Sequence, residues 1–331
     1  MSFVMSKCGL ISHKIRSNAK NNNFLILMYH RVLPLAEVDW KIQPGMYVSD
    51  DSLRMHVRFL KRYFSLVPLS HFITGNTSCQ NIEKPLCAIT FDDGWRDFYD
   101  YAYPVLKAHD VPATVFLATD FIGSYDMFWT DRVTLLLEQS EHLDKIHFED
   151  DMELNKVICS IKGLSGSKGQ KLEKAIEILK ALPLRRIEKL LDSALPDGNF
   201  RKNSRVFLAW DGIHEMQKGG LISFGSHTCS HQILTTLDEN DITAELENSK
   251  EVLLRKNVCH HDFIPFCYPN GNYTDHIAEL VKQAGYSMAV TTNNGWNNNM
   301  GNLYKLKRVG IHNDMTFTES MFAAQIVSLF G

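Results

Sequence analysis

A pair of neighbouring carboxylates is the first feature of this sequence that suggests chemistry. The apolar run Leu86–Phe91 ends at Asp92 and Asp93, and Gly94 follows at once. A buried strand that ends in this way would bring both acids to the rim of a sheet, and the glycine lets the chain turn sharply. Because two carboxylates this close repel each other, a bound metal ion is the usual way to offset their charge.

A pair of histidines suggests the other ligands of such a metal. His227 and His231 are four residues apart and follow a second apolar run, 221–224. If the segment is helical, this spacing places both rings on one face. Two histidines and one aspartate leave positions open for water and substrate, which is typical of a catalytic metal site. Each pair alone is common, but together at predicted strand ends they indicate a shared site.

The elements that must position these residues alternate along the chain. Short apolar runs predict strands over 24–29, 86–91, 112–117, 221–224, 263–268, 288–291 and 306–311. Helical spacing predicts helices over 52–63, 95–109, 238–256, 272–284 and 316–330, with Pro104 interrupting or restarting the second of them. This alternation predicts an α/β fold with a parallel sheet, and seven or eight strands are enough to close a barrel.

Two segments do not follow the alternation. The stretch 123–210 is rich in Lys and Glu and has helical spacing, so we expect a helical insertion within one domain spanning 24–331. Residues 1–23 form an N-terminal extension. Its basic and apolar side chains over 1–20 would suit peripheral contact with an anionic membrane, but a frayed, solvated terminus is the commoner structure for such a segment.

Composition excludes several classes of protein. A net charge of −3 over 331 residues, with no basic stripe, argues against a nucleic-acid partner. The seven cysteines are scattered without a C-x-x-C pair, so reduced thiols in a cytosolic protein are the simplest interpretation. No apolar run reaches the roughly 18 residues of a transmembrane helix, and the start lacks the apolar core of a signal peptide. We therefore expect a cytoplasmic protein.

The motifs resemble those of a known family. Thr90–Gly94 and Ser226–His231 resemble the first two motifs of the polysaccharide deacetylases, the NodB-homology group or carbohydrate esterase family 4. Phe266–Gly271 stands where the family has its third motif, and Leu306–Ile311 resembles a late strand motif. Leu27–Val32 is similar to the N-terminal segment of the exopolysaccharide-modifying branch. The resemblance covers about residues 24–312 without the insertion, and it implies a distorted (β/α)7–8 barrel.

The resemblance also implies roles for individual residues. Asp93, His227 and His231 would hold a divalent metal, for which zinc is the default and cobalt, nickel or manganese would fit. Asp92 would be the general base that activates water, and a backbone N–H at Tyr268 would help to hold the oxyanion. The implied activity is removal of N-acetyl groups from a sugar of a surface polysaccharide or its lipid-linked precursor.

Two roles have competing candidates. The general acid that protonates the leaving amine would be His30 by resemblance to the branch, and His312, which also follows a strand, is the alternative. The family's usual third-motif arginine is absent here, and so is its partner aspartate in the fourth motif. Arg308 is the residue that could orient Asp92 instead.

Other readings of the same residues stay open. A related hydrolase of C–N bonds in small amides would use the same barrel, and a catalytically silent carbohydrate-binding relative would keep the fold without the reaction. Cys229 lies between the two histidines, but a thiolate there would close a site that needs open positions. Cys259–Asp262 resembles a metal cluster, although a solvated loop is the simpler interpretation. Tryptophans that might meet sugar rings are Trp95, Trp129, Trp210 and Trp296, with Trp129 and Trp296 in the most loop-like contexts.

Overall fold

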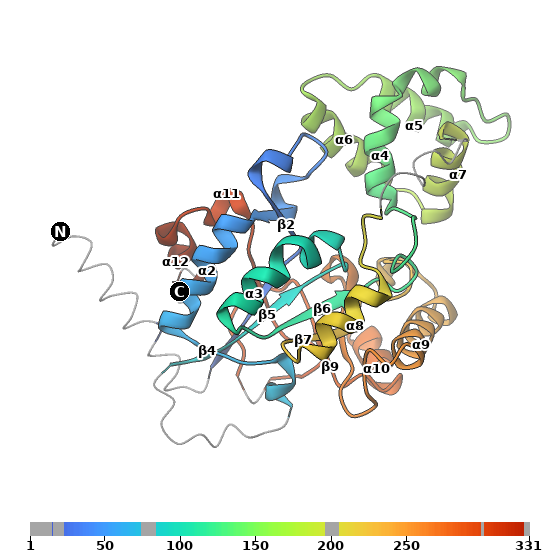
Figure 1. Cartoon of the computed structure of the whole chain (residues 1–331). Coiled ribbons are helices and arrows are strands. Elements are labelled where there is room, and N and C mark those ends of the chain that lie inside the picture. The colour runs from blue at the N-terminus through green and yellow to red at the C-terminus, as the bar shows by residue number, and fades with distance from the viewer. Residues whose placement is uncertain (1–14, 16–22, 74–83, 196–204, 299–300, 328–331) are drawn as a thin grey trace. The chain divides into compact units, whose positions relative to one another are not determined.

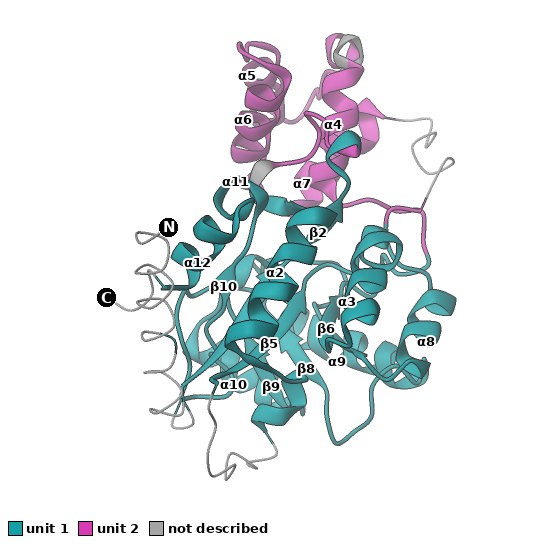
Figure 2. Ribbon diagram, turned by 60° about the vertical axis from the view of Figure 1, so that its left-hand side comes forward, with its two compact units in different colours: residues 1–36, 44–123, 207–331 teal, residues 37–43, 124–206 magenta. Residues whose placement is uncertain are grey.

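A computed structural model describes residues 15, 23–73, 84–195, 205–298 and 301–327. The chain divides into two compact units, shown in teal and magenta in Figure 2. The first contains residues 1–36, 44–123 and 207–331, and the second contains 37–43 and 124–206. The extension 1–23 and its expected membrane contact lie outside the described residues, apart from Ile15 and Asn23. No helix in the described part of the chain is long and apolar enough to span a membrane.

A parallel sheet forms the centre of the first unit (Figure 1). Its strands run in the order β10-β1-β5-β6-β7-β8-β9, with β4 paired to β5. The strands are β1 (Phe24–Tyr29), β4 (Ser65–Leu66), β5 (Leu86–Phe91), β6 (Ala113–Leu117), β7 (Ile222–Ser226), β8 (Pro265–Cys267), β9 (Met288–Val290) and β10 (Val309–Gly310). Nearly every residue of β1, β5 and β6 is buried, which explains why these strands are continuous apolar runs.

The sheet curls round because one segment bonds to both of its edges. The Leu306 N–H donates to Ala289 O in β9, at 3.1 Å, while the Ile311 N–H donates to Met28 O in β1, at 2.9 Å. Residues 306–311 thus connect the two ends of the strand order, as in a distorted barrel. The predicted fold class is confirmed, and all carboxyl ends of the strands face one rim.

Helices surround this sheet (Figure 1). Helix α2 packs against β4, α8 and α9 pack against β7, and α10 packs against β9. Their bounds are α2 (Asp50–Tyr63), α3 (Tyr103–His109), α8 (Trp210–Lys218), α9 (Glu239–Arg255), α10 (Asp275–Gln283), α11 (Asn313–Thr316) and α12 (Glu319–Val327). A separate pair of parallel strands, β2 (Arg31–Leu33) and β3 (Tyr47–Ser49), follows the end of β1.

Two of the predicted helices differ from the observed ones. The helix predicted over 95–109 contains a π-helical turn at Phe98–Ala102, and α3 follows it directly with Pro104 in its first turn, so the proline does not break the helix. The single terminal helix predicted over 316–330 is wrong in its first part, since α11 ends at Thr316 and α12 begins at Glu319. Residues 328–331 of that prediction lie outside the described chain.

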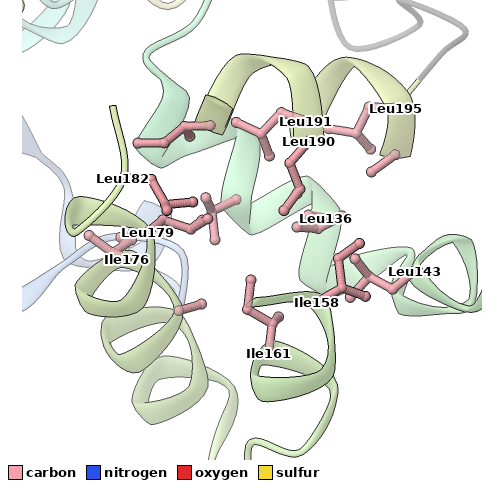
Figure 3. Close-up of a cluster of buried hydrophobic side chains, with 14 of the residues drawn as sticks. Leu136, Leu143, Ile158, Ile161, Ile176, Leu179, Leu182, Leu190, Leu191 and Leu195 are labelled. Carbon is pink, nitrogen blue, oxygen red and sulfur yellow. The ribbon is translucent and has the colours of Figure 1, made fainter. Parts of the chain in front are cut away.

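The second unit is helical and has a hydrophobic core of its own. Its helices are α4 (Trp129–Glu138), α5 (Met152–Lys162), α6 (Lys168–Lys180) and α7 (Leu184–Ala194). Figure 3 shows how leucine and isoleucine side chains from these helices converge, among them Leu136, Ile158, Leu179 and Leu191. The helical spacing within 123–210 therefore predicts the helical character of this unit correctly. Residues 37–43, from an earlier part of the chain, belong to the same compact unit.

Candidate metal centre

The predicted ligands meet at the carboxyl rim of the sheet. Asp93 follows β5 and His227 follows β7, and these strands are both neighbours of β6. Asp93 Oδ1 lies 3.4 Å from His227 Nε2 and 3.2 Å from His231 Nε2. Asp93 and His227 are buried, while His231 is about a quarter exposed, so one side of the cluster faces solvent. The three residues form a group with the side chains and spacing that a metal ion requires.

The distances between these atoms fit a tetrahedral ion. Nitrogen and oxygen ligands lie about 2.0–2.2 Å from zinc, so neighbouring ligands of a tetrahedral site are roughly 3.3 Å apart. The observed 3.2 and 3.4 Å separations match that spacing. Hydrogen bonds with His227 and His231 also hold the pKa of Asp93 well below its usual range, although burial alone would raise it. The chain thus keeps a charged ligand at a buried position.

Strained turns bring the ligands together. Asp93, Thr228 and His231 have φ values of 74°, 67° and 59°, in the left-handed region that residues other than glycine rarely adopt. This segment is therefore not a helix, so the prediction that helical spacing would place His227 and His231 on one face is wrong. Backbone strain of this kind concentrates at functional sites, where the surroundings must stabilise it.

Gly94 is required at the turn after Asp93. Its φ is 78°, and a Cβ there would lie 2.9 Å from side-chain atoms of Leu117 and Ile122. A larger residue would strain the turn at this positive φ and would have to displace the ends of the Leu117 and Ile122 side chains. The sequence indicated this turn correctly.

Two contacts hold the histidines in position. His227 Nδ1 lies 2.8 Å from the Cys267 carbonyl oxygen, so Nδ1 carries a proton and Nε2 is the nitrogen that faces Asp93 and would bind a metal. The Glu245 carboxylate, on α9, accepts hydrogen bonds from the N–H groups of Cys229 and Ser230, at 2.8 and 3.0 Å. This fixes the loop that carries His231. Sequence reasoning missed Glu245, whose only signal is its place beside the inner-face residue Leu246.

Asp92 is held by Arg308 in a buried bidentate pair. Arg308 Nη1 and Nη2 donate to Asp92 Oδ1 and Oδ2, each at 2.7 Å, and neither side chain is more than 3% exposed. Arg308 itself is fixed by bonds to Thr291 O, at 2.9 Å, and Thr90 Oγ1, at 3.0 Å. Burial raises the pKa of Asp92, but the charge and hydrogen bonds of Arg308 outweigh burial and lower it. Asp92 therefore stays ionised and fixed in direction.

Cys267 is a second residue of the site that sequence reasoning missed. Its Sγ lies 3.5 Å from Asp92 Oδ2 and 3.2 Å from Arg308 Nη2. Asp92, His227 and Cys267 also have the spacing of a metal group. However, the Arg308 cation contacts both Asp92 and Cys267, and a positive neighbour disfavours a second cation. The group with Asp93 is the better metal site.

The two candidates for general acid have different surroundings. His30 Nε2 lies 3.9 Å from Asp92 Oδ2, at the end of β1 and beside the site. Burial lowers the pKa of His30, and the negative charges of Asp93 and Asp92 oppose this effect. His312 Nδ1 instead pairs with the exposed Asp314, at 2.7 Å. The geometry favours His30, and the assignment stays a prediction.

The chain also matches known proteins. A sequence model of the family described as polysaccharide deacetylase matches residues 80–289, which is more than half of the chain. The chain belongs to the polysaccharide deacetylase family. It is accordingly a hydrolase of the deacetylase type, as its resemblance to the family predicted.

Named relatives and solved structures agree with this membership. The chain is 26% identical to the poly-β-1,6-N-acetyl-D-glucosamine N-deacetylase of Staphylococcus epidermidis, over 75% of this chain and 86% of the relative. It is 24% identical to the putative polysaccharide deacetylase YxkH of Bacillus subtilis, over 92% and 76% of the two chains. Its fold is similar to that of the Streptococcus pyogenes deacetylase PplD, with a TM-score of 0.56, 21% identity, and coverage of 93% of this chain and 98% of that one. IcaB from Ammonifex degensii gives a TM-score of 0.54 at 16% identity, over 92% and 96% of the two chains.

The backbone N–H of Tyr268, the expected oxyanion donor of this deacetylase, already has a partner in the sheet. Its backbone N–H donates to Val290 O of the neighbouring strand, at 3.3 Å, and its hydroxyl donates to Tyr304 O, at 3.0 Å. To hold an oxyanion, that N–H would have to break its hydrogen bond to Val290 O or donate to both acceptors at once. The oxyanion role of Tyr268 therefore stays a prediction.

The remaining candidates pack within the deacetylase. Cys229 Sγ donates to the Glu245 carbonyl oxygen, and Cys259 Sγ donates to that of Phe224, so both thiols face helices or strands. Within the described residues, Cys259–Asp262 supplies no group with metal-ligand spacing. Trp129 packs against the helical core, and Trp296 stacks on Phe64 with ring centroids 6.1 Å apart.

Proposed function

We propose that this deacetylase removes N-acetyl groups from an N-acetylated surface polysaccharide in a metal-dependent reaction. One observation carries the proposal: Asp93, His227 and His231 form a ligand set at zinc-like spacing, and a separate ionised carboxylate, Asp92, lies beside it. The name of the S. epidermidis relative supports poly-β-1,6-N-acetyl-D-glucosamine as the first polymer to test.

The residues divide the chemistry between them. A divalent cation, by proposal zinc, would supply the Lewis acidity that polarises an acetyl carbonyl and makes water easier to deprotonate. Asp92 accepts the water proton, because Arg308 keeps it charged and leaves lone pairs of its two oxygens available. His30, 3.9 Å from Asp92, donates a proton to the leaving amine. Arg308 positions Asp92 and does not itself contact the substrate.

The choice of Asp92 as base and Asp93 as ligand follows from their partners. Asp93 faces two imidazoles, whereas both oxygens of Asp92 accept bonds from a guanidinium. A carboxylate already paired with a cation gains little by binding a metal ion. The two acids therefore have separate roles.

The test measures acetate release from β-1,6- and β-1,4-linked N-acetylglucosamine oligomers and from a lipid-linked N-acetylated sugar. We expect release that is lost with a chelator, restored by zinc, and lowered about 10²- to 10⁴-fold in Asp92→Asn. Arg132→Met, in the helical unit, serves as the control substitution. Release from small amides alone would favour the related C–N hydrolase, and oligomer binding without release would favour the silent relative.

A cytoplasmic location and a lipid-linked precursor are finer parts of the same proposal. Cell fractionation tests the location, and recovery of the protein outside the membrane barrier would contradict it. The lipid-linked substrate in the panel tests the precursor.

A further inference from the structure

Trp95 contacts the proposed metal ligand Asp93 from the side away from the histidines. The indole Nε1 donates a hydrogen bond to Asp93 Oδ2, at 2.8 Å. The other oxygen, Oδ1, is the one near His227 and His231. The two oxygens of a single carboxylate therefore have different partners, and Oδ1 is the one that faces the histidines.

The indole of Trp95 is covered by two stacked groups. The guanidinium of Arg31 lies 4.5 Å from the ring centroid, and the ring of Phe207 lies 4.6 Å away at an interplanar angle of 21°. Both groups therefore pack against the indole. Trp95 is only 4% exposed, which leaves no face for stacking on a sugar ring.

Each stacked group is itself fixed. Arg31 Nε donates to Asp97 Oδ2, at 2.7 Å, and the Val32 N–H donates to Asp97 Oδ1, at 2.9 Å. Phe207 pairs with Trp95 through a backbone bridge, and the Leu208 N–H donates to Gly94 O, at 2.9 Å. The indole therefore has little freedom to rotate, and its N–H stays directed at Asp93.

We propose that Trp95 is a positioning residue for Asp93, and that Arg31 and Asp97 hold the indole in place. This inference rests on the proposed metal site. A hydrogen bond to Oδ2 orients the carboxylate and disfavours binding through both oxygens, so Asp93 offers one ligand atom. A site with three protein ligand atoms keeps the open positions that catalysis needs.

The test uses Trp95→Phe, which keeps an aromatic ring to pack with Arg31 and Phe207 but removes the N–H donor. We expect zinc affinity, measured by competition with a chromophoric chelator, to fall about 10- to 100-fold. The visible absorption spectrum of the cobalt-substituted protein should change, because it reports the number and geometry of the ligands. The control is Trp210→Phe on α8, which should leave affinity and spectrum unchanged.

Further variants separate the possible failures. Arg31→Met loses the guanidinium that covers the indole and should weaken zinc binding less than Trp95→Phe does, with melting temperature measured for each variant. If Asp93→Ala binds zinc like the wild type, the proposed metal site itself is wrong. If Asp93→Ala loses zinc while folded Trp95→Phe retains wild-type affinity and cobalt spectrum, only the positioning role is overturned. If Trp95→Phe does not fold, Arg31→Met provides the test, and wild-type zinc affinity in that variant would overturn the positioning role of Trp95.

Discussion

The pairing of Arg308 with Asp92 predicts a specific effect on activity and stability. We consider Arg308→Met, which keeps an apolar side chain of similar length but removes the charge and five donors. In the wild type, Arg308 is fully buried and makes two 2.7 Å bonds to Asp92. The variant leaves Asp92 as a buried carboxylate without the guanidinium that pairs with both of its oxygens.

The magnitude follows from the cost of an unpaired buried charge. Removing one partner of a buried ion pair costs about 3–5 kcal/mol of unfolding free energy at neutral pH. We expect kcat to fall about 10- to 100-fold or more, since a residue that orients an active-site group typically contributes that much. Arg308→Lys should be intermediate, because lysine keeps the charge but cannot form the bidentate pair.

The structure also predicts how the effect of Arg308→Met changes with pH. In the wild type the pKa of Asp92 is lowered, so the pair stabilises the fold above the usual aspartate pKa and this stability is lost as pH falls through the lowered value. In the variant burial, which raises the pKa of Asp92, is opposed only by His30 and His227, so this pKa should be higher than in the wild type. The acidic limb of the kcat/KM profile should therefore move to higher pH, and the stability gap between the proteins should narrow as pH falls.

The assay combines denaturant unfolding of the chelator-treated proteins with acetate release across pH. Arg132→Met is the control, because Arg132 is also buried but its partner Asp192 is 69% exposed and can regain water. Loss of that pair should lower the unfolding free energy of the control by about 1 kcal/mol or less, and the control should keep the wild-type pH profile of acetate release. An Arg308→Met protein with wild-type stability and an unmoved acidic limb would refute the reasoning.

Two further predictions follow from buried or partly buried histidines. His30→Ala should lower kcat about 10²- to 10⁴-fold in acetate release while His312→Ala stays near wild type, and the reverse result would transfer the general-acid role to His312. His56 is fully buried, accepts a bond from the Tyr29 hydroxyl and donates to Thr316 O, and burial lowers its pKa to about 4. As pH falls below about 6.5, the His56 imidazole becomes protonated in the unfolded chain but stays neutral in the folded one. By pH 4 this difference should lower the free energy of unfolding by roughly 3 kcal/mol. Urea unfolding checks this: His56→Gln should lose that part of the pH dependence, and an unchanged slope would contradict it.

Local patterns predicted the parts of this protein that depend on neighbouring residues in the chain. Continuous apolar runs identified β1 and β5 with their observed bounds, since a strand buried on both faces has little choice of side chain. The turn at Asp93 and Gly94 and the restart of α3 at Pro104 follow from the backbone limits of glycine and proline. The sequence also predicted which acids and histidines would meet, because parallel strands end at one rim.

Contacts between distant residues were decided by the tertiary structure. Arg308 meets Asp92 across 216 positions only because residues 306–311 close the sheet beside β1. His227 and His231 converge through left-handed turns rather than a helix, and Glu245 holds their loop from α9. Sequence periodicity reports the burial and local geometry of one segment, whereas strand order and register determine which side chains face each other across the sheet. The sequence offered Arg308 as a partner for Asp92, but the bidentate geometry of that pair and the contacts that hold Asp93 became visible only in the folded chain.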